Sequence, residues 1–286
     1  MSIIFALITF IGWGVGDLFA AIATRASSAK YAYFWAMTFA FMISALYIPY
    51  AGPITNWGMF FLACLFNIIH GLANLSALKG FEVGKTSIVG TLAGTSTVIT
   101  VLISLFLFNE TLRGIQIFGI VLITLGGIML AFKFGKNAFK RENIFSDPGI
   151  IYGLGAMLGW GIYFAIVRIP AEEIGWFWAG FPLYPMALLM PFFMTSLKRD
   201  LTKIFSMKKL FMVVILYMLF MTIADYTYNL AILAGFTSVV SPISDAYPVL
   251  FVILTRYVFK EHLSGQQKSG IIISLAGIVV MGISSV

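Results

Sequence analysis

Four ionisable side chains stand inside long apolar stretches of this sequence: Asp17, His70, Asp225 and Asp245. A charged side chain at the centre of a membrane helix costs roughly 2.5–3.5 kcal/mol on insertion scales, so it is rarely kept for packing alone. A carboxyl group away from water holds its proton more readily, and it can release that proton when a cation arrives. We therefore interpret these four residues as candidates for substrate binding or proton coupling.

The spacing around His70 places polar groups on one face of a helix. Asn67, His70 and Asn74 lie at i, i+3 and i+7, and such positions share one face. At an offset of 155 residues, His70 and Asn74 correspond to Asp225 and Asn229. We expect the two matched ionisable positions to face each other. The alternative is that these groups only satisfy one another between helices, where such hydrogen bonds are worth about 0.6 kcal/mol on average.

Asp245 lies between two prolines, with Ser244 and Tyr247 beside it and with Pro242 and Pro248 on either side. Proline removes a backbone donor and kinks a helix, and broken helices at membrane depth are tolerated only near protein or water. The segment is therefore a candidate binding or gating element. The alternative is a plain hinge in which neighbouring hydroxyl groups hold the carboxylate.

Aromatic side chains with polar tips accompany the acids. The candidates for the walls of a cavity are Trp13, Trp160, Tyr163, Tyr184, Tyr228 and Tyr247. Aromatic faces beside carboxylates attract organic cations, and they would equally suit an aromatic amino acid. The pattern favours a small cationic or zwitterionic substrate.

Composition indicates the elements that position these residues. The chain has 286 residues, of which 60% are hydrophobic and 10% charged, whereas soluble domains carry about 25% charged residues. Apolar stretches of about 20 residues, long enough to span a bilayer, recur throughout. We predict an all-α polytopic membrane protein with ten transmembrane helices, at about 3–24, 31–50, 57–78, 86–108, 114–134, 149–169, 176–197, 210–233, 237–258 and 269–285.

The basic residues predict the orientation. With these helices, Arg113 and Arg168 fall on the side of the N-terminus, and the other 16 of the 18 Lys and Arg residues fall on the opposite side. Cytoplasmic loops carry the excess of positive charge. We therefore expect a multi-pass protein of the plasma (inner) membrane with both termini on the non-cytoplasmic side. The basic loops contact membrane lipid in this view, and no nucleic acid is needed to explain the net charge of +7.

The chain repeats itself. Residues 110–126 read ETLRGIQIFGIVLITLG and residues 261–277 read EHLSGQQKSGIIISLAG, so both follow E-x-L-x3-Q-x2-G-x6-G. We divide the chain into a first five-helix repeat at 1–134, a basic cytoplasmic linker at 135–148 and a second repeat at 149–286. Because five is odd, the second repeat enters the membrane inverted, as in many secondary transporters. We expect Glu110 and Glu261 to be architectural, at helix N-termini that favour negative charge, and the glycines to allow close helix contact.

These features resemble the EamA branch of the drug/metabolite transporter superfamily. The resemblance rests on the 5+5 pattern, on GWG at 12–14 and 159–161, and on the duplicated ending, and it covers essentially the whole chain. It implies a basket-like fold with a central cavity lined mainly by helices 1, 3, 4, 6, 8 and 9, with helices 5 and 10 peripheral. Helix 4 has Thr91 and Thr97 where helix 9 has prolines, so we expect the halves to bend unequally. Small multidrug resistance proteins of this superfamily use an acid in their first helix for protons and cationic drugs, and Asp17 resembles it in position only.

We therefore predict a secondary transporter that works by alternating access. It would carry an amino acid or organic cation, either exchanged for protons or by facilitated diffusion, as a monomer or homodimer. The alternatives are a channel-like pore and a non-transporting membrane receptor or enzyme. The sequence has no nucleotide-binding loop, only two histidines and no Cys/His cluster, so we expect no enzyme, no cofactor and no metal site. For Asp17, the alternative to a functional role is a hydrogen bond to helix 3 or 4.

Overall fold

The computed structural model describes residues 1–131, 147–190, 204, 207–260 and 262–284, and regular structure within them is entirely helical. The predicted linker at 135–148 and the motif residue Glu261 lie almost wholly outside these residues. The helices of the first half are α1 Ser2–Ala26, α2 Ala29–Ala45, α3 Trp57–Val83, α4 Thr86–Gly94, α5 Thr97–Leu107 and α6 Gly114–Ala131. Those of the second half are α8 Gly149–Ile166, α9 Arg168–Gly180, α10 Leu183–Met186, α14 Lys208–Ala234, α15 Thr237–Asp245, α16 Pro248–Val258 and α17 Gly265–Ser284.

Seven helical segments among the described residues are long and apolar enough to cross a membrane. They are α1, α3, the pair α4–α5, α8, α14, the pair α15–α16, and α17, while α6 is a shorter apolar helix. Their exposed surfaces carry large apolar side chains such as Leu65, Phe106 and Ile272, as expected for a surface that faces lipid. The chain is a multi-pass helical membrane protein.

The seventh predicted span, at 176–197, is helical in its described part but less regular than predicted. Helix α9 joins two helices at a kink: Gly175 has φ 81°, so the second of them starts at Trp176 and ends at Gly180. The short α10 follows, and Pro182 and Pro185 lie at its start and within it. A positive φ suits glycine and proline cannot continue a helix without loss of a hydrogen bond, so hydropathy alone overestimated the regularity of this segment. In the second predicted span, α2 ends at Ala45 and a short 3-10 helix follows at Ile48–Tyr50, where the prediction ended.

The two broken helices correspond. Helix α15 ends at Asp245, and α16 begins at Pro248. Helix α4 ends at Gly94 and α5 begins at Thr97, although this half has no proline there. Both halves therefore break at matched positions, 151 residues apart, and unequal bending at these breaks stays a prediction.

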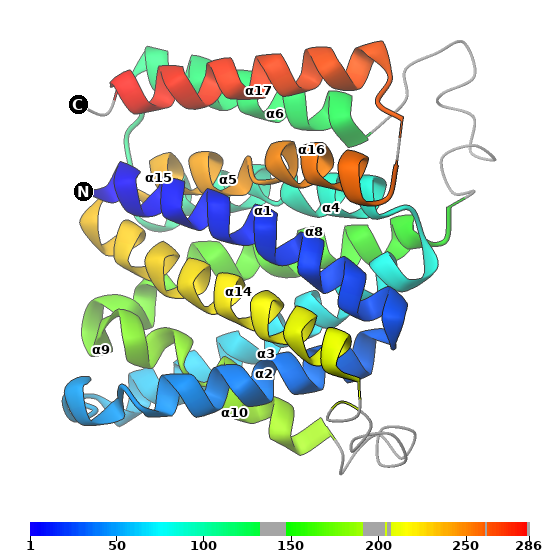
Figure 1. Ribbon diagram of the computed structural model, residues 1–286. Helices are drawn as coiled ribbons and strands as arrows, with labels where there is room; N and C mark the ends of the chain where they lie inside the picture. Colours follow the sequence, from blue (N-terminus) through cyan, green and yellow to red (C-terminus); the bar gives the residue numbers. More distant parts are fainter. Residues whose placement is uncertain (132–146, 191–203, 205–206, 261, 285–286) are drawn as a thin grey trace.

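Close helix contacts hold the layers together (Figure 1). Helices α6 and α17 lie side by side as an outer layer, peripheral to the rest of the bundle. They meet through the motif glycines: a Cβ added to Gly277 would lie 2.8 Å from the Gly119 carbonyl oxygen, and one added to Gly270 would lie 2.8 Å from that of Gly126. Inside this layer, α4–α5 and α15–α16 lie against each other, and α1 pairs with α14 as α3 pairs with α8.

The break between α4 and α5 is in contact with the break between α15 and α16. A Cβ on Gly94 would clash with the Pro248 ring and would lie 3.3 Å from the Asp245 carbonyl oxygen. Glycine at this position therefore lets the two broken helices cross in direct contact. The four half-helices α4, α5, α15 and α16 meet at this crossing point.

Candidate functional site

A cavity lies inside the bundle, between helices of both halves. It is lined by Trp13, Asp17, His70, Asn74, Trp160, Phe164, Met221, Asp225 and Tyr247. These residues come from α1, α3, α8, α14 and the break between α15 and α16. The cavity contains about 250 Å³ of empty space, but this space is so narrow that it has room for only about one water molecule. The cavity is therefore closed around its lining side chains.

Asp225 is the most firmly held acid of the cavity. The Trp13 indole Nε1–H donates to its Oδ1 atom over 2.9 Å. In the matched position of the other half, Trp160 donates to the Oδ1 atom of Asn74 over 2.8 Å. The two tryptophans correspond at an offset of 147, yet one holds a carboxylate and the other a neutral amide. This difference makes the cavity acidic on one side only.

Asp17 and His70 bring polar atoms without partners into the same cavity. Among the described residues, neither Oδ2 of Asp17 nor Nδ1 of His70 has a hydrogen-bond partner. The hydroxyl group of Tyr247 lies near Asp17. The His70 ring stacks on Tyr163 with centroids 4.1 Å apart. Since buried polar atoms are nearly always paired, these atoms are available to a bound molecule.

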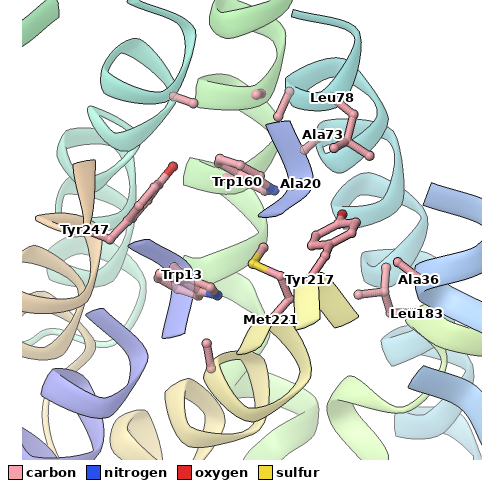
Figure 2. Close-up of a cluster of buried hydrophobic side chains, with 14 of the residues drawn as sticks. Trp13, Ala20, Ala36, Ala73, Leu78, Trp160, Leu183, Tyr217, Met221 and Tyr247 are labelled. Atoms are coloured by element: carbon pink, nitrogen blue, oxygen red, sulfur yellow. The ribbon is translucent and has the colours of Figure 1, made fainter. Parts of the chain in front are cut away.

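Aromatic rings complete the wall. The Trp13 ring lies 4.7 Å from Phe164 and 5.9 Å from Tyr247, measured between centroids. Figure 2 shows Trp13, Trp160 and Tyr247 entering this region from three different elements, with Met221 beside them. Neither Lys nor Arg is among the lining residues. Carboxylates beside aromatic faces, without Lys or Arg, form a site suited to a cation.

The other predicted cavity residues lie behind this wall. The amide of Asn67 donates to the Ala179 carbonyl over 2.8 Å, and that of Asn229 donates to the Trp176 carbonyl over 3.0 Å. These are interhelical bonds, as in the packing alternative for the asparagines. The remaining predicted residues are buried outside the lining: Tyr163, Tyr184, Tyr228 and Ser244.

Sequence reasoning missed two lining residues, Phe164 and Met221. Phe164 is the repeat counterpart of Asp17 at the offset of 147, which is the signal that could have found it. Met221 precedes Asp225 by four residues and therefore shares its helix face.

Asp245 lies in a second pocket, not in the first. This pocket has about 310 Å³ of empty space and lies where the broken helices meet α6 and α17. The Ser241 hydroxyl donates to Oδ2 of Asp245 over 2.9 Å, while Oδ1 has no partner among the described residues. Pro248 lines the same pocket, and Pro242 lies inside α15.

Comparison with known proteins identifies the family. The model of the EamA-like transporter family matches residues 1–132 and 147–283. The chain belongs to this family. Its members, part of the drug/metabolite transporter superfamily, are membrane transporters of small solutes rather than enzymes. No curated protein matches the chain.

A solved crystal structure has the same fold as this EamA-like transporter. The two agree with a TM-score of 0.69, over 99% of this chain and 96% of that chain, at 19% sequence identity. At this identity the likeness shows the fold alone.

At one end of this EamA-like transporter, Glu110 connects elements of both halves. Its carboxylate accepts hydrogen bonds from the backbone N–H groups of Thr237 and Ser238, both over 2.8 Å, and it pairs with Arg168 over 2.6 Å. Glu110 is architectural, as expected, but it caps α15 of the other half rather than the helix that follows it. The Arg168 guanidinium group also lies 5.1 Å from the centre of the Phe108 ring.

The opposite end has a similar set of contacts around Arg25. The Arg25 guanidinium group lies 4.5 Å from the centre of the Phe259 ring and donates to the Thr86 hydroxyl group over 3.3 Å, at the start of α4. Phe108 and Phe259 correspond at the offset of 151. Each end therefore has an arginine, an aromatic ring and the first turn of a broken helix.

Proposed function

We propose that this transporter moves a small cationic or zwitterionic metabolite, an amino acid or organic amine, through the central cavity. The observation that carries the proposal is the pair Asp17 and Asp225 in a cavity walled by aromatic rings and lined by neither Lys nor Arg. A cation that enters this site meets carboxylates that have little other compensation. The same carboxylates can carry protons when the cation is absent, so exchange of substrate for protons follows from the charge balance.

An inverted repeat is supported by the backbone. We assign the repeats to residues 1–134 and 149–286, with five membrane segments each. Asn109 and Lys260, with φ 50° and 56°, are the two residues other than glycine with positive φ in the described chain, and they are 151 residues apart. The pairing of α1 with α14 corresponds to that of α8 with α3. Positive φ is uncommon outside glycine, so its recurrence at matched positions favours duplication of one structural unit.

The narrow cavity favours a carrier over an open pore. With room for about one water molecule, the cavity cannot pass an organic solute without rearrangement. The contacts of Arg168 and those of Arg25 lie at opposite ends of the bundle. In alternating access, one set of contacts would open while the other stays in place. In the proposed orientation, both termini lie on the non-cytoplasmic side of the plasma membrane.

Transport into liposomes tests the proposal. Purified protein is reconstituted with a pH-sensitive dye inside, and amino acids, polyamines and quaternary ammonium ions are added one at a time beside protein-free vesicles. We expect a saturable pH change with a subset of cationic or zwitterionic compounds. Asp17→Asn and Asp225→Asn should reduce the rate at least tenfold, because a lost charge contact of about 1.5–3 kcal/mol corresponds to that factor or more.

Glu173→Gln is the matched control, because this carboxylate is exposed and outside the cavity. It should leave the rate unchanged. Saturable uptake of a radiolabelled cation without a pH change would replace proton exchange by facilitated diffusion. Flux that does not saturate would favour the pore, and full activity in both aspartate variants would remove the assigned site.

A further inference from the structure

The second pocket, around Asp245, is built differently from the central cavity. It lies at the crossing of the two broken helices, where Gly94 contacts Pro248. Its polar lining consists of one carboxylate and hydroxyl groups: Thr91, Thr95, Thr97, Thr124, Ser274 and Asp245. Aromatic rings are absent from this lining, so the pocket offers oxygen atoms where the central cavity offers ring faces.

Oxygen atoms gather around the Asp245 carboxylate. The Ser241 hydroxyl group donates to Oδ2 and lies 3.3 Å from the hydroxyl oxygen of Thr97. The Ser96 hydroxyl group lies near the same carboxylate. Asp245 is 3% exposed, and Ser96, Thr97 and Ser241 are 1%, 2% and 0% exposed. Asp245 and Thr97 line the pocket, and Ser96 and Ser241 stand directly behind that lining. The group is thus buried, and Asp245 Oδ1 has no hydrogen-bond partner among the described residues.

The charge of this group has no partner in the described chain. No Lys, Arg or His lines the pocket, and Arg168 is paired with Glu110 and Glu172. An isolated buried carboxylate is far too costly to keep in its charged form without compensation. A proton on Asp245 or a positive ion within the pocket supplies that compensation, and the two would compete for the same carboxylate.

The ligand set decides which ion fits. Carboxylate and hydroxyl oxygens are ligands of hard cations. A divalent ion normally draws on several carboxylates, whereas this pocket has one, and no group of three His, Cys, Asp or Glu side chains gathers in the described residues. One negative charge with neutral oxygens matches a monovalent ion. Broken helices at a repeat interface are where secondary transporters place such ions.

We propose that Asp245, with the hydroxyl groups of Ser96, Thr97 and Ser241, binds a sodium ion. The ligands come from α15 and from the start of α5, so the ion joins the two halves at the crossing point. This site is separate from the substrate cavity, which has its own acids in Asp17 and Asp225. The sodium site therefore gives the transporter a second ion that can bias its conformations, in addition to the proton exchange proposed above.

Sodium alone, without substrate, tests the site. Thermal unfolding of the detergent-purified protein is followed by tryptophan fluorescence in NaCl and in choline chloride of equal ionic strength. At a sodium concentration about ten times Kd, the midpoint temperature should rise by roughly 3–6 °C relative to choline. Asp245→Asn should abolish the rise. Asp225→Asn, a matched carboxylate in the central cavity, should retain it.

A second pair of variants covers the case in which Asp245→Asn does not fold. Thr97→Val removes a ligand oxygen and keeps the shape, so the sodium concentration at half-effect should rise at least about tenfold. Thr100→Val is the control, since Thr100 lies one turn further along α5 and donates to the Gly161 carbonyl. The proposal would be overturned by equal midpoint temperatures in NaCl and choline chloride, or by a full sodium-dependent rise in Asp245→Asn. An unchanged sodium concentration at half-effect in Thr97→Val would overturn it as well.

The outcome is independent of the proposed transport activity. Substrate-driven pH changes in sodium-free vesicles, with no loss of rate, would uphold the central site even if sodium has no effect on unfolding. A sodium-dependent rise in the midpoint temperature that requires Asp245, together with a lack of cation transport, would support the sodium site and contradict the proposed substrate.

Discussion

At the scale of single residues, the character of the cavity depends on what each tryptophan holds. Trp13 and Trp160 occupy matched positions, but their indole N–H groups meet Asp225 and Asn74 respectively. A hydrogen bond to a charged group contributes about 1.5–3 kcal/mol, compared with about 0.5–1.5 kcal/mol between neutral groups. The hydrogen bonds of the two tryptophans should therefore differ in their influence on the binding of a cationic substrate.

Trp13→Phe tests this difference. The change keeps an aromatic ring beside Phe164 and removes the donor that orients Asp225, so we expect the KM for the cationic substrate to rise roughly tenfold or more. Trp160→Phe removes the donor to a neutral amide and should raise KM only about threefold. Initial rates of uptake into liposomes over a substrate series measure both. Equal effects of the two variants would contradict the assignment of Asp225 as the substrate's charge partner.

At the scale of elements, Glu110 joins the two halves through backbone groups. It is 7% exposed and satisfies the first turn of α15, which would otherwise have free N–H groups. Its contact with Arg168 brings the end of α8 to the same place. One side chain thus connects the loop after α5, the start of α9 and the N-terminus of α15.

Glu110→Gln should destabilise the protein markedly. Removal of one partner from a buried ion pair costs about 3–5 kcal/mol, which corresponds to a fall of roughly 6–12 °C or more in the midpoint of thermal unfolding. Glu172→Gln is the matched control, because Glu172 contacts the same Arg168 but is 48% exposed, and exposed pairs contribute about 0–1 kcal/mol. Thermal unfolding in detergent compares the two. Equal midpoints would show that the Glu110 cap contributes little.

At the scale of the whole molecule, several basic connections and the two termini lie at opposite ends. Both termini lie at the same end of the bundle in Figure 1. The connections between α1 and α2, α3 and α4, and α16 and α17 lie at the other end, and these carry basic residues such as Arg25, Lys85 and Lys260. The fold and the positive-inside rule thus agree on which residues share a side.

Reporter fusions test the orientation. A periplasmic-type reporter joined after Ser284, or before Met1, should be active, and the same reporter inserted after Lys260 should be inactive. A cytoplasmic reporter should show the reverse pattern at all three positions. Cytoplasmic activity at both termini would invert the proposed orientation without altering the fold.

The sequence by itself determined the class of the protein and several of its key residues. Low charge and repeated apolar stretches predict a helical membrane protein, and the duplicated ending predicts the family, because both signals are local in the chain. Asp17, His70 and Asp225 stand out for the same reason, since an ionisable residue at membrane depth is conspicuous from its immediate neighbours alone.

Only the tertiary structure decided which of these residues meet. Asp245 leaves the central cavity for a pocket of its own, Glu110 caps a helix of the other half, and helix α4 breaks at Gly94 without a proline. Asn67 and Asn229 turn to backbone carbonyls, while Phe164 and Met221 line the cavity. The physical reason is that hydropathy and spacing describe each helix separately, whereas contacts depend on the depth and rotation of helices that are distant in sequence, and a small rotation moves a side chain from one pocket to another.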